Sequence, residues 1–378
     1  MSNSGGNAPL AEPRDGADPD GTGAHMLDLG QQRRARSRRG GRGDEGSREQ
    51  SMVPRAKFRS YYGRPVLKPP VWEWKIPAYL FTGGLSAGSA VLAAGADLTE
   101  RPALRRVSRI NSLITLLVSA YLLIADLGRP ERFHHMLRVA KPTSPMSVGT
   151  WILTMYGPGI GIAAASELLP AKVRRTMPGR LLDRLARSAG VASAVVAPGV
   201  ASYTAVLLSQ TAAPAWHEAH PQLPFIFTGS AAASAGGLAM ALTPVDEAGP
   251  ARMFAWYGGV SELVASKVME QRLGLAGEAY TTGRAHRLRI WSQRLTAAGL
   301  IGATLAGRRS RAAAVASGLA LLAGSALQRF GVFEAGVAST KDPKYVVVPQ
   351  RQRLEGRTDQ ARQPMADSPV SDHLGPRR

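Results

Sequence analysis

Cysteine is missing from this chain of 378 residues. Without thiolates the chain cannot hold an iron–sulfur cluster through cysteine ligands, and it cannot form a disulfide. A P-loop and a glycine fingerprint for dinucleotides are also missing. The seven histidines fall in predicted tails or loops, whereas a membrane cytochrome b needs histidine ligands within its helices. We therefore expect no haem, iron–sulfur cluster or metal in this chain.

Charged residues are scarce in the middle of the chain, although the chain as a whole carries a net charge of +20. Residues 1–70 form a polar, basic tail and residues 341–378 form a polar tail. Neither tail can bury enough apolar surface to offset chain entropy, so both are predicted to be disordered. Between them, eight apolar segments approach the roughly 20 residues that a membrane-spanning helix needs. They are 76–96, 110–126, 148–168, 188–209, 222–243, 252–270, 292–307 and 312–333.

A soluble helical bundle is the alternative to a membrane protein. Its helices would show polar faces, which the first, second, fourth and fifth segments lack. All six tryptophans fall near segment ends, where the membrane interface favours this residue. We predict an all-α membrane protein with an eight-helix transmembrane domain over 71–340, built as two four-helix bundles over 76–209 and 222–333. The short seventh segment and the charged sixth are the weakest spans.

Eight spans place both termini on one side of the membrane, here named side one. All seven histidines and five of the six tryptophans lie on side one in this topology. The side-two loops are short or simply basic. We therefore expect side one to be the face for docking and reaction. Its loops are 127–147, 210–221 and 271–291, and the side-two loops are 97–109, 169–187, 244–251 and 308–311.

A short motif occurs twice in the apolar region. The sequence Phe81-Thr82-Gly83 recurs as Phe227-Thr228-Gly229, and each copy is soon followed by Ser-Ala-Gly. Four spans separate the copies, as a parallel repeat requires. Chance similarity between two alanine- and glycine-rich helices is an equally good explanation, because small residues are common where membrane helices pack.

Four stretches of the sequence together resemble the NrfD/PsrC family, the membrane subunits of polysulfide-reductase-type complexes. The most specific is ADLGRPERFHHMLRVAKPTSPMS at 125–147. The others are WEWKIPAYLFTGGLSAGS (72–89), SYTAVLLSQTAAPAW (202–216) and VFEAGVASTKDPKYVVVPQRQRL (332–354). The resemblance covers about residues 70 to 355.

The resemblance implies an eight-span, sometimes ten-span, anchor subunit without a cofactor of its own. Such a subunit exchanges electrons between menaquinone or another quinone and a 4Fe–4S ferredoxin-like partner. A molybdopterin-type or similar catalytic subunit completes the implied complex. A secondary transporter, a proton-translocating membrane protein and a passive membrane anchor are the alternative functions.

Quinone chemistry couples electrons to protons, so a site needs hydrogen-bond donors at the two carbonyls and a titratable group nearby. Suitable residues gather at the side-one ends of the first four segments. The resemblance singles out Tyr203, because the corresponding helix of the family contacts quinone. The predicted quinone-binding residues are Tyr203, Tyr79, Glu73 and Arg129, and the predicted proton-relay residues are Asp126, His134 and His135.

Each of these residues also has a structural interpretation. Tyr79 is equally typical of an aromatic belt at the membrane interface. Asp126 and Arg129 can form a pair that caps the second helix, and His134 and His135 can simply face water.

Glu262, Lys267 and Glu270 lie within or near the sixth span. Charges inside a span are costly and usually face a bundle interior or a water-filled path. Glu262, Ser266 and Glu270 share one helix face, which indicates a proton path through the second bundle. The alternative is a structural pair between Lys267 and Glu270, near the helix end.

The basic run QQRRARSRRGGR at 31–42 has no interleaved aromatic residues, so we expect it to lie near anionic lipid rather than on nucleic acid. Lysines and arginines near the spans are almost evenly divided between the two sides, which leaves orientation open. The basic tail and the lack of a recognisable signal peptide favour a multi-pass protein of the plasma membrane with cytoplasmic termini.

Overall fold

The computed structural model describes residues 65–362, so the predicted tail over 1–70 and the end of the C-terminal tail lie almost wholly outside the described residues. The described residues form helices without strands. The long helices are α2 (Lys75–Leu98), α3 (Pro102–Ala125), α4 (Pro145–Leu168), α6 (Met177–Ser209), α8 (Leu223–Leu242), α9 (Gly249–Arg272), α11 (Gly283–Leu305) and α12 (Arg311–Lys341). The shorter ones are η1 (Pro130–Arg138), α5 (Ala171–Arg174), α7 (Pro214–Glu218), η2 (Gly274–Gly277), α10 (Glu278–Thr281) and α13 (Lys344–Arg362).

Local sequence explains where the long helices begin. Pro102 and Pro145 occupy the first turns of α3 and α4, where no backbone N–H donor is needed. At α12 the Ser310 hydroxyl accepts a hydrogen bond from the Ala313 N–H at 3.3 Å. Several helices exceed the apolar segments, since α6 begins at 177 instead of 188 and α11 at 283 instead of 292. Arginine and leucine are good helix formers, so the charged turns continue the helix.

Six of the long helices in the described region are long and apolar enough to cross a membrane: α2, α3, α4, α6, α8 and α12. This confirms an all-helical integral membrane protein. The helices α9 and α11 fall outside this set, and their sequences contain the charged stretches SKVMEQR and GRAHRLRIWSQR.

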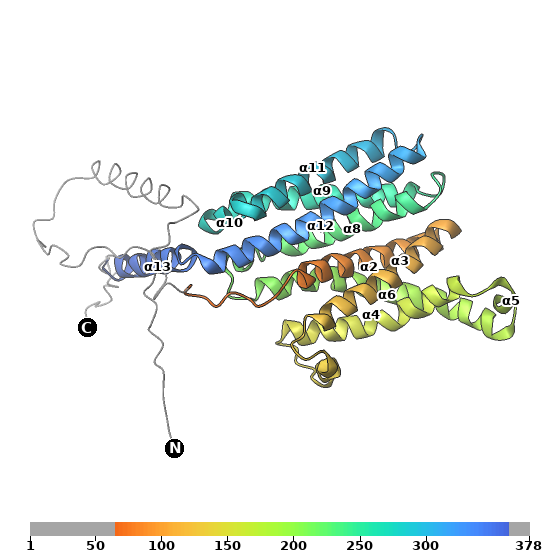
Figure 1. Cartoon of the computed structure of the whole chain (residues 1–378), viewed down its shortest axis with the longest axis horizontal. Coiled ribbons are helices and arrows are strands. Elements are labelled where there is room, and N and C mark those ends of the chain that lie inside the picture. The colour runs from red at the N-terminus through yellow and green to blue at the C-terminus, as the bar shows by residue number, and fades with distance from the viewer. Residues whose placement is uncertain (1–64, 363–378) are drawn as a thin grey trace, which may run out of the picture. The chain divides into compact units, whose positions relative to one another are not determined.

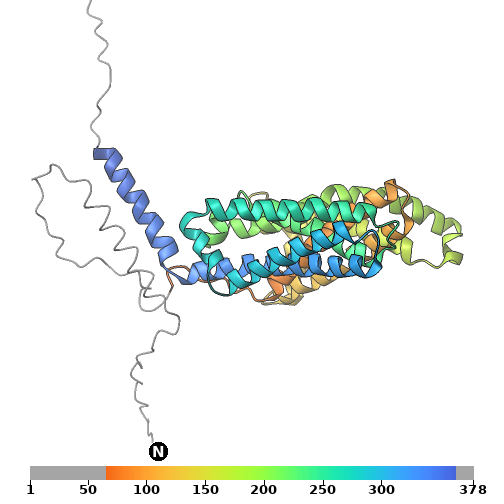
Figure 2. The same cartoon turned by 90° about the horizontal axis from the view of Figure 1, so that it is seen from above.

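Consecutive long helices pack as pairs, namely α2 with α3, α4 with α6, α8 with α9, and α11 with α12. Figure 1 shows α2, α3, α4 and α6 in one group and α8, α9, α11 and α12 in another, and Figure 2 gives the view from above. The groups meet where α2 packs against α8. Small residues permit the close packing: a Cβ on Gly237 of α8 would lie 2.8 Å from the carbonyl oxygen of Gly318 on α12.

The repeated motif has the same local conformation in α2 and α8. The Thr82 hydroxyl donates to the Ala78 carbonyl at 2.9 Å, and the Thr228 hydroxyl donates to the Pro224 carbonyl at 2.8 Å. Both are bonds to the carbonyl four residues earlier. The two motif copies therefore lie on helices that pack against each other and have equivalent threonine bonds.

Two predictions differ from the structure. Trp216 is fully buried rather than interfacial: its Nε1 donates to the Val332 carbonyl at 2.7 Å, and its ring stacks on Trp72. The bond inside the protein removes its need for the membrane interface. The tail beyond Lys341 contains helix α13, because its glutamine, arginine, leucine and glutamate residues favour helix even without an apolar face.

Candidate functional site

The start of α2 and the end of α3 bring three charged residues together. Asp126 follows the last residue of α3, and its carboxylate accepts a hydrogen bond from the Glu73 backbone N–H. The Lys75 Nζ lies 3.2 Å from Glu73 Oε2 and 3.4 Å from the Ala125 carbonyl oxygen. Partial burial raises the pKa of Asp126, although the Glu73 N–H and the Lys75 charge act in the opposite direction.

Two tyrosines lie in the hydrophobic core near the same end. Tyr79 on α2 is 3 % exposed and Tyr203 on α6 is 9 % exposed. They belong to one continuous core, and α2 packs against α6. Neither phenol hydroxyl bonds to another described residue, so both remain able to donate to a ligand. The structure thus brings Tyr79, Tyr203, Glu73 and Asp126 to one end of the first helix group.

The ring of Tyr203 fills the space that Gly149 of α4 leaves open. A Cβ at Gly149 would lie 2.6 Å from Cδ2 and 3.0 Å from Cζ of that ring, both closer than carbon atoms can pack. Gly149 therefore determines the position of the ring. Sequence reasoning missed this residue, since a single glycine in VGTWILTMYG gives no signal of its own.

The remaining predicted residues of this site lie on the surface. Arg129, His134 and His135 are exposed, and η1, which contains both histidines, contacts α4 and α3. The two imidazole rings are 4.4 Å apart. Among the described residues Asp126 makes no ion pair with Arg129, so the predicted capping pair is wrong. Asp126 bonds instead to the Glu73 N–H, because the chain leading into α2 passes beside it.

Glu262 lies inside the second helix group. It is 2 % exposed on α9, and the charge acting on it is that of Arg329 on α12, which is 1 % exposed. The Arg329 Nη2 donates to the Phe227 carbonyl at 2.7 Å, and its guanidinium lies 3.8 Å from the centroid of the Phe227 ring. Glu262 Oε2 and the Nε and Nη1 atoms of Arg329 have no partner among the described residues. Sequence reasoning found Glu262 but missed Arg329.

A line of polar side chains continues from this pair between α9, α11 and α12. Gln328 Nε2 donates to the Ser266 hydroxyl at 3.3 Å, and the Ser292 hydroxyl donates to Gln328 Oε1 at 3.2 Å. Both serines and the glutamine are buried. These hydrogen bonds give buried polar side chains of α9 and α11 a partner on α12.

Glu270 and Lys267 lie outside that line. The main partner of Glu270 is the buried Arg289, and Gln293 Nε2 also donates to it at 2.9 Å. The predicted Lys267–Glu270 pair is present but loose, at 3.8 Å, and the Lys267 side chain is 70 % exposed. Lys267 thus faces outward, away from Glu262.

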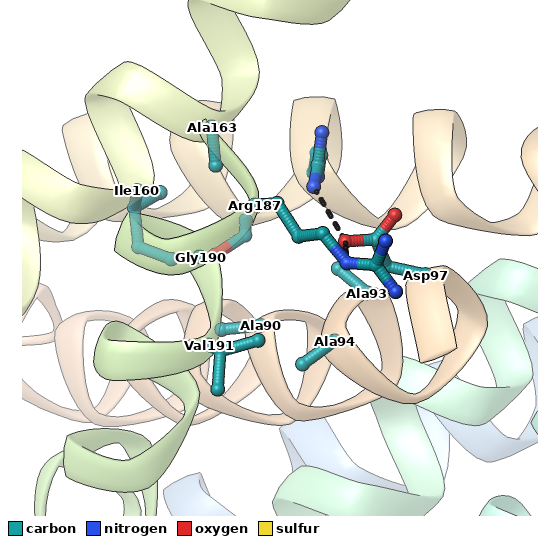
Figure 3. A pocket seen from close by; sticks show the side chains of 11 residues that line it. Ala90, Ala93, Ala94, Asp97, Ile160, Ala163, Arg187, Gly190 and Val191 are labelled. Atoms are coloured by element: carbon teal, nitrogen blue, oxygen red, sulfur yellow. Dashed lines mark hydrogen bonds and ion pairs between the residues drawn. The ribbon is translucent and has the colours of Figure 1, made fainter. Parts of the chain in front are cut away.

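A buried ion cluster at the side-two ends of α2, α3, α4 and α6 escaped sequence analysis. Its carboxylates are Asp97 and Glu167, and Arg109 bridges them with contacts of 3.2 and 3.1 Å. Figure 3 shows Asp97 and Arg187 beside the small cavity at this end. An acidic residue at the end of the first and of the third apolar segment, together with the basic run RPALRRVSR between them, is the signal that could have revealed it. The cluster joins four helices.

Comparison with known proteins agrees with the resemblance in the sequence. Residues 66–246 match the family described as polysulphide reductase, NrfD. The protein is similar to the C chain of the polysulfide reductase of Wolinella succinogenes, with 29 % identity over 151 residues. That match covers 37 % of this protein and 48 % of the relative, so it spans about half the length of the curated relative.

In the structure the matched residues run from just before α2 to just after α8, and they include Tyr79, Asp126 and Tyr203. Among the described residues no group of three or more His, Asp or Glu side chains is placed to hold a metal ion. With six apolar helices in the described region and a match to the NrfD, polysulphide reductase, family over residues 66–246, this chain is a membrane protein that contains an NrfD domain.

Proposed function

We propose that this protein is the quinone-reactive membrane anchor of a multi-subunit oxidoreductase. In this proposal the chain spans the membrane eight times as two four-helix bundles, α2–α3–α4–α6 and α8–α9–α11–α12. The reactive end lies on side one, and both termini lie in the cytoplasm beside the plasma membrane. The observation that carries it is the gathering of Tyr79, Tyr203 and the Asp126–Glu73 contact at one end of the first bundle. The family match covers these residues.

The residues present fit a quinone. Two phenol hydroxyls without described partners are donors suited to carbonyl oxygens, and the surrounding core is apolar enough to exclude water. When bound, a quinone supplies the two-electron, two-proton chemistry. Tyr203 and Tyr79 would donate hydrogen bonds to its oxygens, and Asp126, with its raised pKa, would pass protons to and from side one.

Tyr203→Phe tests the proposed quinone contact. The change removes one hydroxyl and keeps the ring against Gly149, so binding of a quinone analogue should weaken by a few-fold to about tenfold, the equivalent of about 0.5–1.5 kcal/mol. Asp126→Asn should spare binding and slow quinone-linked turnover. Binding by the purified chain and turnover by the complex are the measurements.

Tyr121→Phe is the matched control for these variants, because Tyr121 is 71 % exposed on α3. It should change neither quantity. Unaltered binding and turnover in Tyr203→Phe and Asp126→Asn, with intact protein, would place the quinone elsewhere. A passive anchor would bind no quinone analogue at all.

We further propose that the loop 127–147 docks the 4Fe–4S ferredoxin-like partner, which in turn connects to a molybdopterin-type or similar catalytic subunit. The loop exposes Phe133, Leu137 and Val139 among basic side chains. The carbonyl of Val139 accepts bonds from the Ser147 hydroxyl and the Trp151 indole, at 2.7 and 3.2 Å, which ties the loop to α4. An exposed apolar surface with a charged rim is typical of a protein interface.

Reversing the charge at Arg132 and Arg138 together to glutamate should strongly reduce co-purification of the partner. Both side chains are exposed, so the membrane chain itself should remain folded. Arg308→Glu with Arg309→Glu changes the charge equally at the turn between α11 and α12 and should leave association intact. Equal partner recovery from all preparations would show that the partner uses another surface.

Proton translocation is a second candidate function, supported by the buried Glu262 and Arg329 and the polar line from Ser266 to Ser292. In this proposal Glu262 begins the path, Glu270 lies beyond the polar line at the end of α9, and the exposed Lys267 serves as an outer charge. A secondary transporter would use the same interior. Loss of proton release during quinone turnover in Glu262→Gln would support proton translocation.

A further inference from the structure

The two long helices outside the apolar set, α9 and α11, line an open groove on the outside of the second bundle. The groove between α9 and α11 has a volume of about 370 Å³. Its lining residues are Leu263, Lys267, Glu270, Gln293, Arg294 and Ala297. Basic groups therefore lie at its side-one end, and the apolar Leu263 and Ala297 lie deeper along the same two helices.

The groove carries a net positive charge. Glu270 is its one lining carboxylate, and the buried Arg289 neutralises it. Lys267 and Arg294 remain, and Arg294 has no carboxylate partner among the described residues. Two cations that share at most one carboxylate, beside apolar side chains, are chemically complementary to a phosphodiester with acyl chains.

A tryptophan, the residue type typical of the membrane interface, lies beside one of the two cations. Trp291 is 56 % exposed, as interfacial tryptophans are, and Arg294 follows it by three residues, about 4.5 Å further along α11. The Arg294 guanidinium lies 5.7 Å from the centroid of the Trp291 ring, so the side chain returns toward the interface. Lys267 leans toward Glu270, in the direction of the same membrane surface. Both basic side chains therefore extend toward the same headgroup region.

We propose that this groove binds an anionic glycerophospholipid, whose phosphate contacts Lys267 and Arg294 and whose acyl chain lies along Leu263 and Ala297. The inference rests on the proposed eight-span topology, since α9 and α11 must cross the membrane for the groove to face lipid. A bound lipid would also explain how α9 and α11, which are not among the six apolar helices, can span the bilayer, because its phosphate neutralises their outward charges.

The test uses the purified full-length chain, stripped of lipid in detergent and titrated with phosphatidylglycerol or phosphatidylcholine of the same acyl chains. Native mass spectrometry counts the bound lipids. The wild-type chain should prefer phosphatidylglycerol. Lys267→Gln with Arg294→Gln should weaken its binding about 30-fold, because each basic side chain at a membrane surface contributes about 1 kcal/mol and tenfold corresponds to about 1.4 kcal/mol.

Arg308→Gln with Arg309→Gln is the matched control, because it removes two exposed charges far along the chain from the groove. It should retain the preference. Equal loss in this control, or equal affinity for the two lipids, would overturn the proposal. A dimer that disappears in the Lys267 and Arg294 variant would overturn it as well, since a second copy would then occupy the groove.

Topology is measured separately, so that its failure is recognised. The chain has no cysteine, so the single substitutions Glu278→Cys and Arg309→Cys can be labelled without background. Labelling from opposite sides of the membrane supports a span for α11, the long helix between the two positions. Labelling from one side only would refute the eight-span topology itself, independently of the result for lipid.

Discussion

Arg329→Met should destabilise the protein by about 3–5 kcal/mol, the usual cost of removing one member of a buried charge pair. The cost arises because Glu262, 2 % exposed, would be left in the core without a compensating charge. The variant also loses the bond to the Phe227 carbonyl. Thermal or denaturant unfolding in detergent, with protein yield as a second readout, measures the effect.

The double variant Glu262→Leu with Arg329→Met tests whether the two charges interact. Replacing both charges with apolar groups of similar size is often neutral, so the double variant should recover most of the lost stability. Additive losses would show that the two residues do not interact. A stable double variant that turns over quinone without proton release would assign the pair to proton movement, whereas unchanged release would make it structural.

Gly149→Ala should reduce quinone-linked turnover about 100-fold, as a displacement of about 1 Å in a positioning group can do. The new methyl group would overlap the ring of Tyr203, which must then move. Alanine is the better helix former by about 1 kcal/mol, so the helix itself should not suffer. Steady-state turnover and quinone-analogue binding are the measurements.

Gly161→Ala on the same helix is the matched control. A Cβ there has no atom of another residue within 4 Å, and the substitution should leave turnover unchanged. Gly149→Ala combined with Tyr203→Ala should lower turnover little further than Tyr203→Ala alone, because without the ring the new methyl group has nothing to displace. Full activity in Gly149→Ala would mean that the Tyr203 ring does not position the quinone.

The sequence was sufficient for the class of the protein. Apolar runs of spanning length, interrupted by polar loops, predict membrane helices because an isolated span must satisfy its backbone bonds internally. The motif at 125–147 predicted the family, which the match over 66–246 confirms. The count of eight spans stays a prediction, because α9 and α11 carry too many charges for composition to settle the matter.

The partners of the charged and aromatic side chains were decided by tertiary structure. Sequence placed Asp126 beside Arg129, but the path of the chain into α2 gives it Glu73 and Lys75 as neighbours. Trp216 near a segment end looked interfacial and is buried under α12. Spacing along one helix reports which residues share a face, and it does not report which face of another helix lies opposite. For that reason the charge interaction of Glu262 with Arg329, 67 positions later in the chain, became visible only in the structure, where α9 and α12 both pack against α8.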